Sequence, residues 1–182
     1  RKTWSKFGIE AVVHLGTAHE LICNKDPQTA LQVNGFGTHR LLRNAIEAEV
    51  KRFVHFSTVH VYRTPLQGRL DETIVPRPMP AYAIAHRTGE DFVLSSRDRG
   101  EIDAYVLRLS NAFGAPAFPD VDRWTLLANE LCREAVERRT ITLKTSGLQW
   151  RNFVTLTDVG RAVAHFIDLP VAAGEDGLFN LV

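Results

Sequence analysis

Short apolar runs and longer stretches with helical spacing follow one another along the whole chain. Three apolar runs end in small, polar or aliphatic residues: AVVHLG at 11–16, RFVHFST at 52–58 and AYVLRL at 104–109. Their length and their β-branched residues predict buried strands, as in a parallel sheet. Shorter strands are expected at 140–144, 153–156 and 179–182.

Helical spacing fills the segments between the predicted strands. Asp26-Pro27 has the pattern of an N-cap followed by proline in the first turn, and a helix is expected from there to about Glu49. Further helices are predicted at 81–97, at 123–137, and from Thr157 or Asp158 to 168. Loops are predicted at 17–25, 63–80 and 115–121. This alternation predicts an α/β fold with an open, doubly wound parallel sheet and right-handed crossovers.

Composition narrows the class of protein. The chain has 182 residues, of which 45% are hydrophobic and 24% charged, which is ordinary for a soluble globular domain. The net charge of +1 gives no reason to expect nucleic acid or a membrane as a partner. No apolar run is long enough to cross a bilayer. Two cysteines, Cys23 and Cys132, cannot form a disulfide framework, and a cytoplasmic location is therefore expected.

Polar residues gather where ligands bind in open α/β sheets. Gly16, Ser57, Thr58 and Asn111 all fall at the carboxyl ends of predicted strands. Tyr82 and His86 stand four residues apart at the start of a predicted helix and therefore share one face. A phenol there could accept a proton if nearby positive charge lowers its pKa from about 10. On these residues alone, the commoner interpretation is a half-buried aromatic with a surface neighbour.

Six segments in order carry a family resemblance: HLG at 14–16, NGFGT at 34–38, FVHFSTVHVY at 53–62, YAIAH at 82–86, LRLSNAFG at 107–114 and RNFVTLTDV at 151–159. Together they resemble the extended short-chain dehydrogenase/reductase family, in its NAD-dependent epimerase/dehydratase branch, which acts on nucleotide sugars. The resemblance implies a Rossmann-like sheet. It divides the chain into a partial dinucleotide-binding domain with the catalytic helix at 1–114 and a partial substrate-binding region at 115–182, interleaved with returning Rossmann elements.

The family opens with a glycine-rich phosphate turn and an acidic residue for the adenosine ribose, and neither is present here. Gly35 and Gly37 lie inside a predicted helix, with Arg40 where a third glycine would be needed. With about 30 residues per βαβ unit, the resemblance leads us to expect that roughly 60 residues of the family pattern are missing ahead of Ala11. The C-terminal part of the sugar pocket is expected to be missing as well. We therefore expect a segment of a longer enzyme, whose choice between NAD and NADP cannot be read here.

The resemblance assigns the chemistry residue by residue. Tyr82 matches the catalytic acid/base, with NAD or NADP as the cofactor and a nucleotide sugar as the substrate. In the family, a lysine four residues later binds the nicotinamide ribose and lowers the pKa of the tyrosine. Here it is His86, which could still donate a hydrogen bond to the ribose but is shorter and mostly neutral at pH 7. Thr58, four residues before Tyr62, matches the hydroxyl that holds the sugar oxygen; the alternative is a strand-end threonine that caps a turn.

Other positions are carried over in the same way. The resemblance places Leu15, Gly16, Asn34 and Ser57 beside the cofactor, and Asn111 and Arg151 beside the sugar diphosphate. For Asn34, an internal hydrogen bond to the backbone is nearly as good an explanation. No metal is expected, because the seven histidines lack zinc-site spacing, and His14 and His55 are interpreted as satisfied core residues. Ser57 lacks the Gly-x-Ser-x-Gly frame of a nucleophile elbow.

The residues after Thr58 bear on the reaction. The family's dehydratases carry an Asp-Glu pair there, whereas this chain has Val59-His60, which favours an epimerase or reductase. One alternative is a catalytically weak dinucleotide-binding sensor or regulator, suggested by His86. Another is a reductase of a non-sugar carbonyl or alcohol. The resemblance also implies a homodimer formed through the helices at 27–49 and 81–97.

Overall fold

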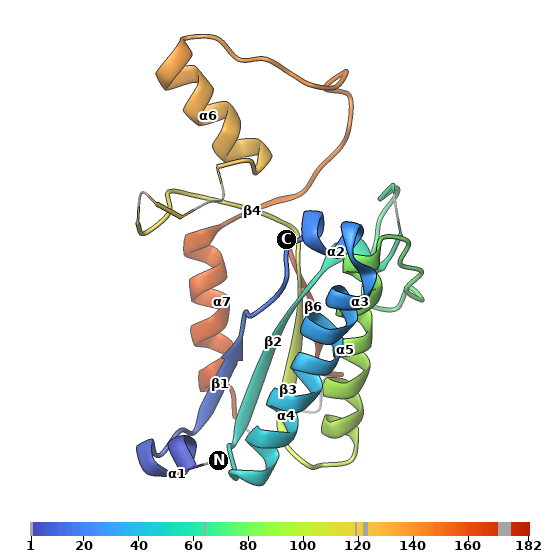
Figure 1. Ribbon diagram of the computed structural model, residues 1–182, viewed down its shortest axis with the longest axis vertical. Helices are drawn as coiled ribbons and strands as arrows, with labels where there is room; N and C mark the ends of the chain where they lie inside the picture. Colours follow the sequence, from blue (N-terminus) through green and yellow to red (C-terminus); the bar gives the residue numbers. More distant parts are fainter. Residues whose placement is uncertain (1, 64, 119, 122–123, 171–175) are drawn as a thin grey trace. The chain divides into compact units, whose positions relative to one another are not determined.

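The computed structural model describes residues 2–63, 65–118, 120–121, 124–170 and 176–182 (Figure 1). The chain divides into two compact units, which are described one at a time. The first comprises residues 1–109 and 163–181, and the second comprises residues 110–162 and 182. A short helix, α1 (Lys2–Phe7), precedes the first strand.

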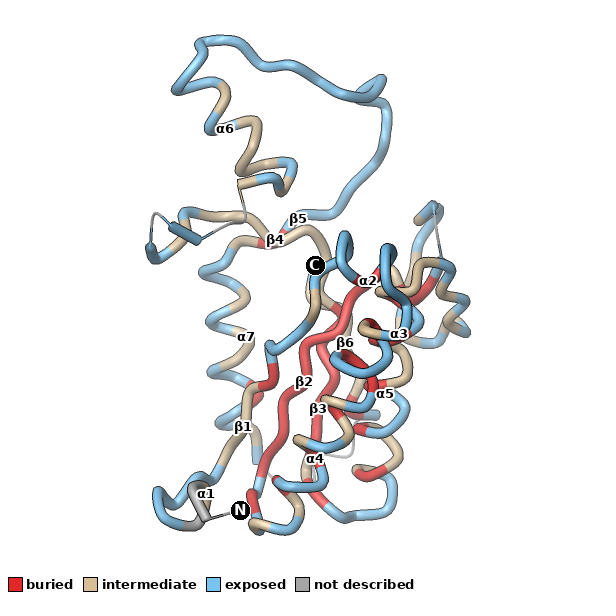
Figure 2. The backbone as a smooth tube through the Cα atoms, viewed as in Figure 1, coloured by how far each residue is buried: buried red, intermediate tan, exposed pale blue. Residues whose placement is uncertain are grey.

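A parallel sheet forms the centre of the first unit. It is built from β1 (Ala11–His14), β2 (Arg52–Thr58), β3 (Asp103–Leu109) and β6 (Leu178–Leu181), in the order β1-β2-β3-β6. All seven residues of β2 are buried, and the buried colour follows β2 and β3 in Figure 2. The predicted α/β fold with a parallel sheet is therefore confirmed.

Helices cover both faces of this sheet. On one face, α3 (Pro27–Ala30), a wider π-helical stretch η1 (Leu31–Phe36) and α4 (Gly37–Glu47) run on from one another, and α5 (Ala81–Asp98) packs beside them. The Asp26 carboxylate caps α3 by accepting from the backbone N–H groups of residues 28 and 29. On the other face, the Phe166 ring packs against Tyr105 and Phe179.

The second unit contains a small parallel ladder of β4 (Asn111–Phe113) and β5 (Phe153–Thr155), together with α6 (Leu127–Arg138). Helix α7 (Leu156–Asp168) begins in this unit and ends in the first. The Thr155 hydroxyl accepts from the Asp158 N–H at 3.0 Å, so Thr155 makes the capping bond predicted for Thr157 or Asp158.

Two further predictions are wrong. The expected loop at 17–25 contains α2 (Glu20–Lys25), whose Cys23 is fully buried against Ala30 and Ala85. The expected strand at 140–144 is irregular, because its alternating Ile141 and Leu143 meet no partner strand in the described part of the chain. Helix α6 begins at Leu127, and the predicted start at Arg123 lies outside the described residues. No helix in the described ranges is long and apolar enough to cross a membrane.

Candidate functional site

The first unit brings its candidate residues to the carboxyl ends of β1 and β2 and to the start of α5. Helix α5 contacts η1, β2, β3 and η2 (Val59–Val61), the short turn after β2. Gly89 permits this close packing, since a Cβ there would lie 3.0 Å from the Asn34 carbonyl oxygen and 3.2 Å from Nε2 of His55. The helix that carries Tyr82 is therefore held tightly against the strand that carries Thr58.

Tyr82 and His86 lie together on one face of α5, as their spacing predicts. Their ring centroids are 4.4 Å apart in an edge-to-face arrangement. His86 is only 3% exposed, so the interpretation of a surface neighbour is wrong. Its Nε2 lies 3.1 Å from Oγ1 of Thr17, in the loop after β1. The imidazole is thus tied to the loop where the cofactor is expected.

His14, His55 and His86 form a stacked column inside the first unit. The His14 and His55 centroids are 5.2 Å apart, and those of His55 and His86 are 6.3 Å apart. His14 has a partner in Thr38, at 3.0 Å, as expected for a satisfied core residue. His55 differs from that expectation, because neither of its buried ring nitrogens has a hydrogen-bond partner among the described residues.

This burial keeps the histidines neutral. Burial lowers the pKa of His14, and burial with the neighbouring His86 and His14 lowers the pKa of His55 well below its ordinary value. Burial, assisted by His14, lowers the pKa of His86 to about 4. At pH 7 residue 86 therefore supplies no positive charge to lower the pKa of the Tyr82 phenol.

The two hydroxyl residues at the end of β2 point to different partners. The Thr58 hydroxyl oxygen accepts from the His60 N–H at 3.3 Å, so the turn-capping alternative is present in the structure. The Ser57 hydroxyl donates to Oε1 of Glu90 on α5 at 2.5 Å. The contact predicted between Thr58 and a sugar oxygen, and that between Ser57 and the cofactor, both remain predictions.

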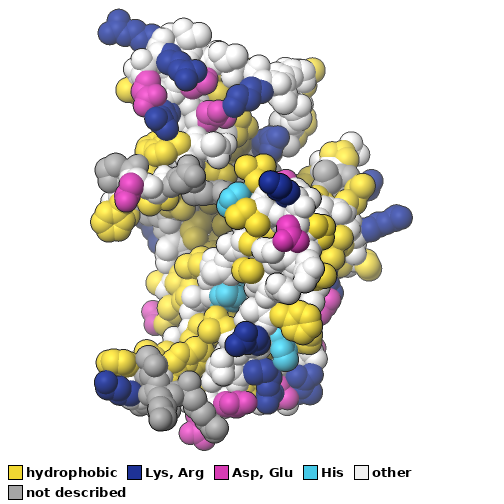
Figure 3. Space-filling view, in the orientation of Figure 1, with side chains coloured by type: hydrophobic (Ala, Val, Ile, Leu, Met, Phe, Trp, Pro, Cys, Tyr) yellow, Lys and Arg dark blue, Asp and Glu magenta, His cyan; other side chains and the backbone are white. Residues whose placement is uncertain are grey.

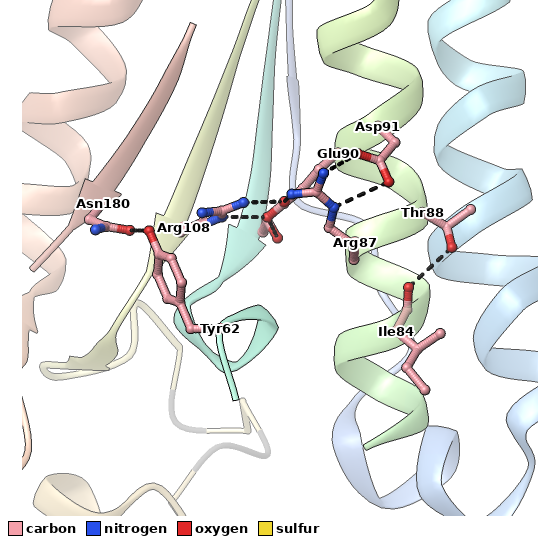
Figure 4. A network of polar contacts seen from close by, with 9 residues as sticks. Tyr62, Ile84, Arg87, Thr88, Glu90, Asp91, Arg108 and Asn180 are labelled. Carbon is pink, nitrogen blue, oxygen red and sulfur yellow. Dashed lines mark hydrogen bonds and ion pairs between the residues drawn. The ribbon is translucent and has the colours of Figure 1, made fainter. Parts of the chain in front are cut away.

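Glu90 belongs to a buried polar network that sequence reasoning missed (Figure 4). Its carboxylate accepts from Nε and Nη2 of Arg108 at 3.0 and 2.8 Å, and both side chains are fully buried. The Arg108 guanidinium lies 4.6 Å from the centroid of the Tyr62 ring. A signal was available, because an arginine within an apolar strand needs a buried counter-charge. Glu90 lies one helical turn after His86 and was the obvious candidate.

The loop after β1 is fixed by Asn34. Its amide oxygen accepts from the Ala18 N–H at 2.7 Å, and its amide nitrogen donates to the Ala18 carbonyl at 3.2 Å. The Asn34 side chain thus bonds the backbone of this loop. The alternative, a hydrogen bond from Asn34 to the backbone of its own helix, is not the arrangement found. Leu15 and Gly16, in the same loop, are exposed. Sequence reasoning missed Thr17, because nothing in the spacing links it to α5.

The second unit brings the two predicted diphosphate ligands near one another. Asn111 pairs with Phe153 across the β4–β5 ladder, and its side-chain amide donates to the Asn152 carbonyl at 2.9 Å. Arg151 is exposed and directly precedes Asn152. A cavity of about 290 Å³ lies in the same unit, with an almost wholly apolar lining that includes Phe113 and Leu156. The described residues contain no group of three or more His, Cys, Asp or Glu side chains placed to hold a metal ion.

Comparisons with known proteins identify the family whose sequence model this chain matches. The sequence model of the NAD dependent epimerase/dehydratase family matches residues 1–181. Human dTDP-D-glucose 4,6-dehydratase is 33% identical over 132 residues, which cover 71% of this chain and 36% of that protein. UDP-glucose 4-epimerase of Rhizobium leguminosarum bv. trifolii is 26% identical over 168 residues, covering 86% of this chain and 51% of that protein.

Solved structures give the same picture. MoeE5 in complex with UDP-glucuronic acid and NAD superposes with a TM-score of 0.77 at 25% identity, over 96% of this chain and 56% of that one. UDP-glucuronic acid 4-epimerase from Bacillus cereus in complex with NAD gives 0.78 at 26% identity, over 97% of this chain and 55% of that one. The chain therefore spans about half the length of these structures, and its match covers about a third of the human dehydratase.

Proposed function

Because the chain belongs to the NAD-dependent epimerase/dehydratase family, we propose that it forms part of an NAD-dependent enzyme that acts on a nucleotide sugar. The observation that carries the proposal is the Tyr82–His86 pair at the start of α5, packed against the loop after β1. The MoeE5 structure, which contains NAD and UDP-glucuronic acid, supports the cofactor and the class of substrate.

The residues present fit one end of the cofactor. An exposed loop at Leu15 and Gly16 lies at the end of a parallel strand, and Asn34 fixes it at Ala18. His86 contacts this loop and keeps a buried Nδ1 without a hydrogen-bond partner among the described residues. These groups suit the nicotinamide end, and no glycine-rich turn for the phosphates occurs in this sequence. When bound, the cofactor would supply reversible hydride transfer.

Tyr82 would act as the acid/base. Its phenolate would accept the proton of a sugar hydroxyl as that carbon is oxidised, and return it when the ketone is reduced on its other face. Thr58 would hold the reacting oxygen by a hydrogen bond. Because His86 is neutral, the phenol would depend on the positive charge of the oxidised cofactor for activation. Asn111 and Arg151 would bind the diphosphate, for which a guanidinium is well suited.

We favour an epimerase or reductase over a dehydratase. The family's dehydratases carry an Asp-Glu pair where this chain has Val59 and His60. Val59 is buried and cannot transfer a proton, so the elimination of water would lack one of its groups. The human relative at 33% identity is a dehydratase, so the test must distinguish the two reactions by their products.

The test uses the whole protein that contains this chain. It is incubated with NAD and a panel of UDP-, dTDP- and GDP-sugars, or with NADH and the corresponding 4-keto sugars, and the products are identified by NMR. An epimer or a reduced sugar supports the proposal, and the product should disappear with Tyr82→Phe. A 4-keto-6-deoxy sugar would instead show dehydration.

A second candidate is a cofactor-binding sensor or regulator with weak catalysis. The neutral, buried His86 favours it, because the family lysine normally lowers the pKa of the tyrosine. Binding of NADH without turnover of any sugar would support the sensor, and a large gain in rate from His86→Lys would show that His86 attenuates the native site.

We also propose a homodimer through the helices of the first unit. Val33 and Phe36 on η1 and Ile84 and Phe92 on α5 are 37–63% exposed, and hydrophobic side chains lie on the face seen in Figure 3. Sedimentation equilibrium should give a dimer, and Phe36→Glu should shift it towards a monomer. An unchanged dimer with Phe36→Glu would place the contact elsewhere.

A further inference from the structure

The segment that joins Thr58 to Tyr82 closes into a loop. The Tyr62 carbonyl accepts from the Arg77 N–H at 2.8 Å, so the two ends of the stretch 63–76 meet. Compact surface loops with joined ends are frequently functional. This one begins five residues after Thr58 and ends six residues before Tyr82. Any change in its position acts on the two elements that carry the candidate acid/base and its hydroxyl partner.

Asn180 of β6 uses three polar groups to contact Tyr62, which directly precedes the loop, and two residues of the loop itself. Its Oδ1 accepts from the Tyr62 hydroxyl at 2.8 Å, and its Nδ2 donates to the Leu70 carbonyl at 3.3 Å. Its backbone N–H donates to Oε1 of Glu72. One residue of the sheet therefore holds the loop at its start and near its middle.

The network continues from the loop to the catalytic helix. The Tyr62 ring lies under the Arg108 guanidinium, which forms the buried pair with Glu90 on α5 (Figure 4). Glu90 also accepts from Ser57, the residue that precedes Thr58. The path from Asn180 to Glu90 thus reaches both β2, which carries Thr58, and α5, which carries Tyr82. It uses no group that is assigned to the substrate.

We propose that Asn180 and Tyr62 form a latch that positions the loop 63–76 and, through it, Thr58 relative to Tyr82. The roles of Thr58 and Tyr82 rest on the proposed function, whereas the latch itself rests on the contacts above. Asn180 and Tyr62 are positioning residues that act through the loop and the buried pair.

Limited trypsin digestion tests the latch directly. The loop offers Arg69 as an exposed cleavage site, and the fragments cut there are identified by mass spectrometry. Tyr62→Phe removes only the hydroxyl, and we expect cleavage after Arg69 to become about five-fold faster, because the rate follows the open population. Asn180→Ala, which removes two side-chain contacts, should accelerate it further. In the double variant, the cleavage rate should equal that of Asn180→Ala alone, because the Tyr62 hydroxyl has already lost its partner.

Tyr105→Phe is the matched control. The Tyr105 ring also lies 4.6 Å from a guanidinium carbon, that of Arg97, but its buried hydroxyl has no hydrogen-bond partner among the described residues. Its cleavage rate should equal that of the wild type. Equal rates for Tyr62→Phe and wild type, or equal acceleration by both tyrosine variants, would overturn the latch. Thermal unfolding shows whether a variant has lost its fold. If Asn180→Ala has lost it, the cleavage rate of Tyr62→Phe alone tests the latch.

Turnover tests the positioning role. Asn180→Ala should lower kcat at least about ten-fold with little change in KM for NAD, because small displacements of catalytic groups are costly. An open loop with an unchanged kcat would refute this role. If the wild-type protein converts no sugar, the proposed function fails, while the cleavage rates still decide the latch.

Discussion

The histidine column predicts a marked loss of stability in mild acid. Above pH 6.5 the His86 imidazole is neutral in both the folded and the unfolded chain. Below that pH the unfolded chain binds a proton that the folded chain excludes until about pH 4. The free energy of unfolding therefore falls between pH 6.5 and about 4. From these two pKa values, His86 alone should remove about 2 kcal/mol at pH 5 and about 3 kcal/mol at the acid limit.

Urea unfolding followed by tryptophan fluorescence at pH 7.5 and pH 5 measures this effect. His14 and His55 shift in the same direction, so the wild type should lose more than the share of His86. In His86→Asn the residue no longer titrates, and the difference between the two pH values should shrink by about 2 kcal/mol. His19→Asn changes an exposed histidine and serves as the control.

The reasoning would be refuted if His86→Asn kept the full pH dependence of the wild type. The same holds if His19→Asn reduced it as much. Either result would mean that the column is not the group that excludes protons from the folded chain.

Two further predictions concern the buried groups around α5. Glu90→Gln should lower the free energy of unfolding by about 3 kcal/mol, since it leaves Arg108 charged and buried. Glu101, which pairs with Arg99 and is partly exposed, provides the control. Glu101→Gln should lower the free energy of unfolding by no more than about 1 kcal/mol. Equal losses would contradict the importance of burial. His86→Lys should raise turnover and move its pH optimum lower, measured by initial rates from pH 6 to 10, whereas an unchanged profile would show that residue 86 does not tune Tyr82.

The sheet was predictable because its signals are local. Buried parallel strands read as apolar runs, and β2 and β3 were found within one residue of their ends. Helix α2 was missed because six residues are too few to show a period, and its stability comes from packing against Ala30 and Ala85. The alternation at 140–144 was misleading, because a strand also needs a neighbour.

The site was predictable only in part. The spacing of Tyr82 and His86 correctly placed both on one helix face, but nothing local showed that His86 would be buried. The contacts of Asn34 with Ala18 and of Asn180 with the loop join residues far apart in the sequence. Such contacts depend on how the sheet and helices pack together, and this packing cannot be inferred from individual residues in the sequence.

The central claim is that Tyr82 transfers the proton while a nucleotide sugar exchanges hydride with NAD. The most direct measurement is the single-turnover conversion of a nucleotide sugar by the whole protein, with Tyr82→Phe beside it. We predict conversion by the wild type and a loss of at least about 100-fold with Tyr82→Phe. Equal rates in the two proteins would contradict the account.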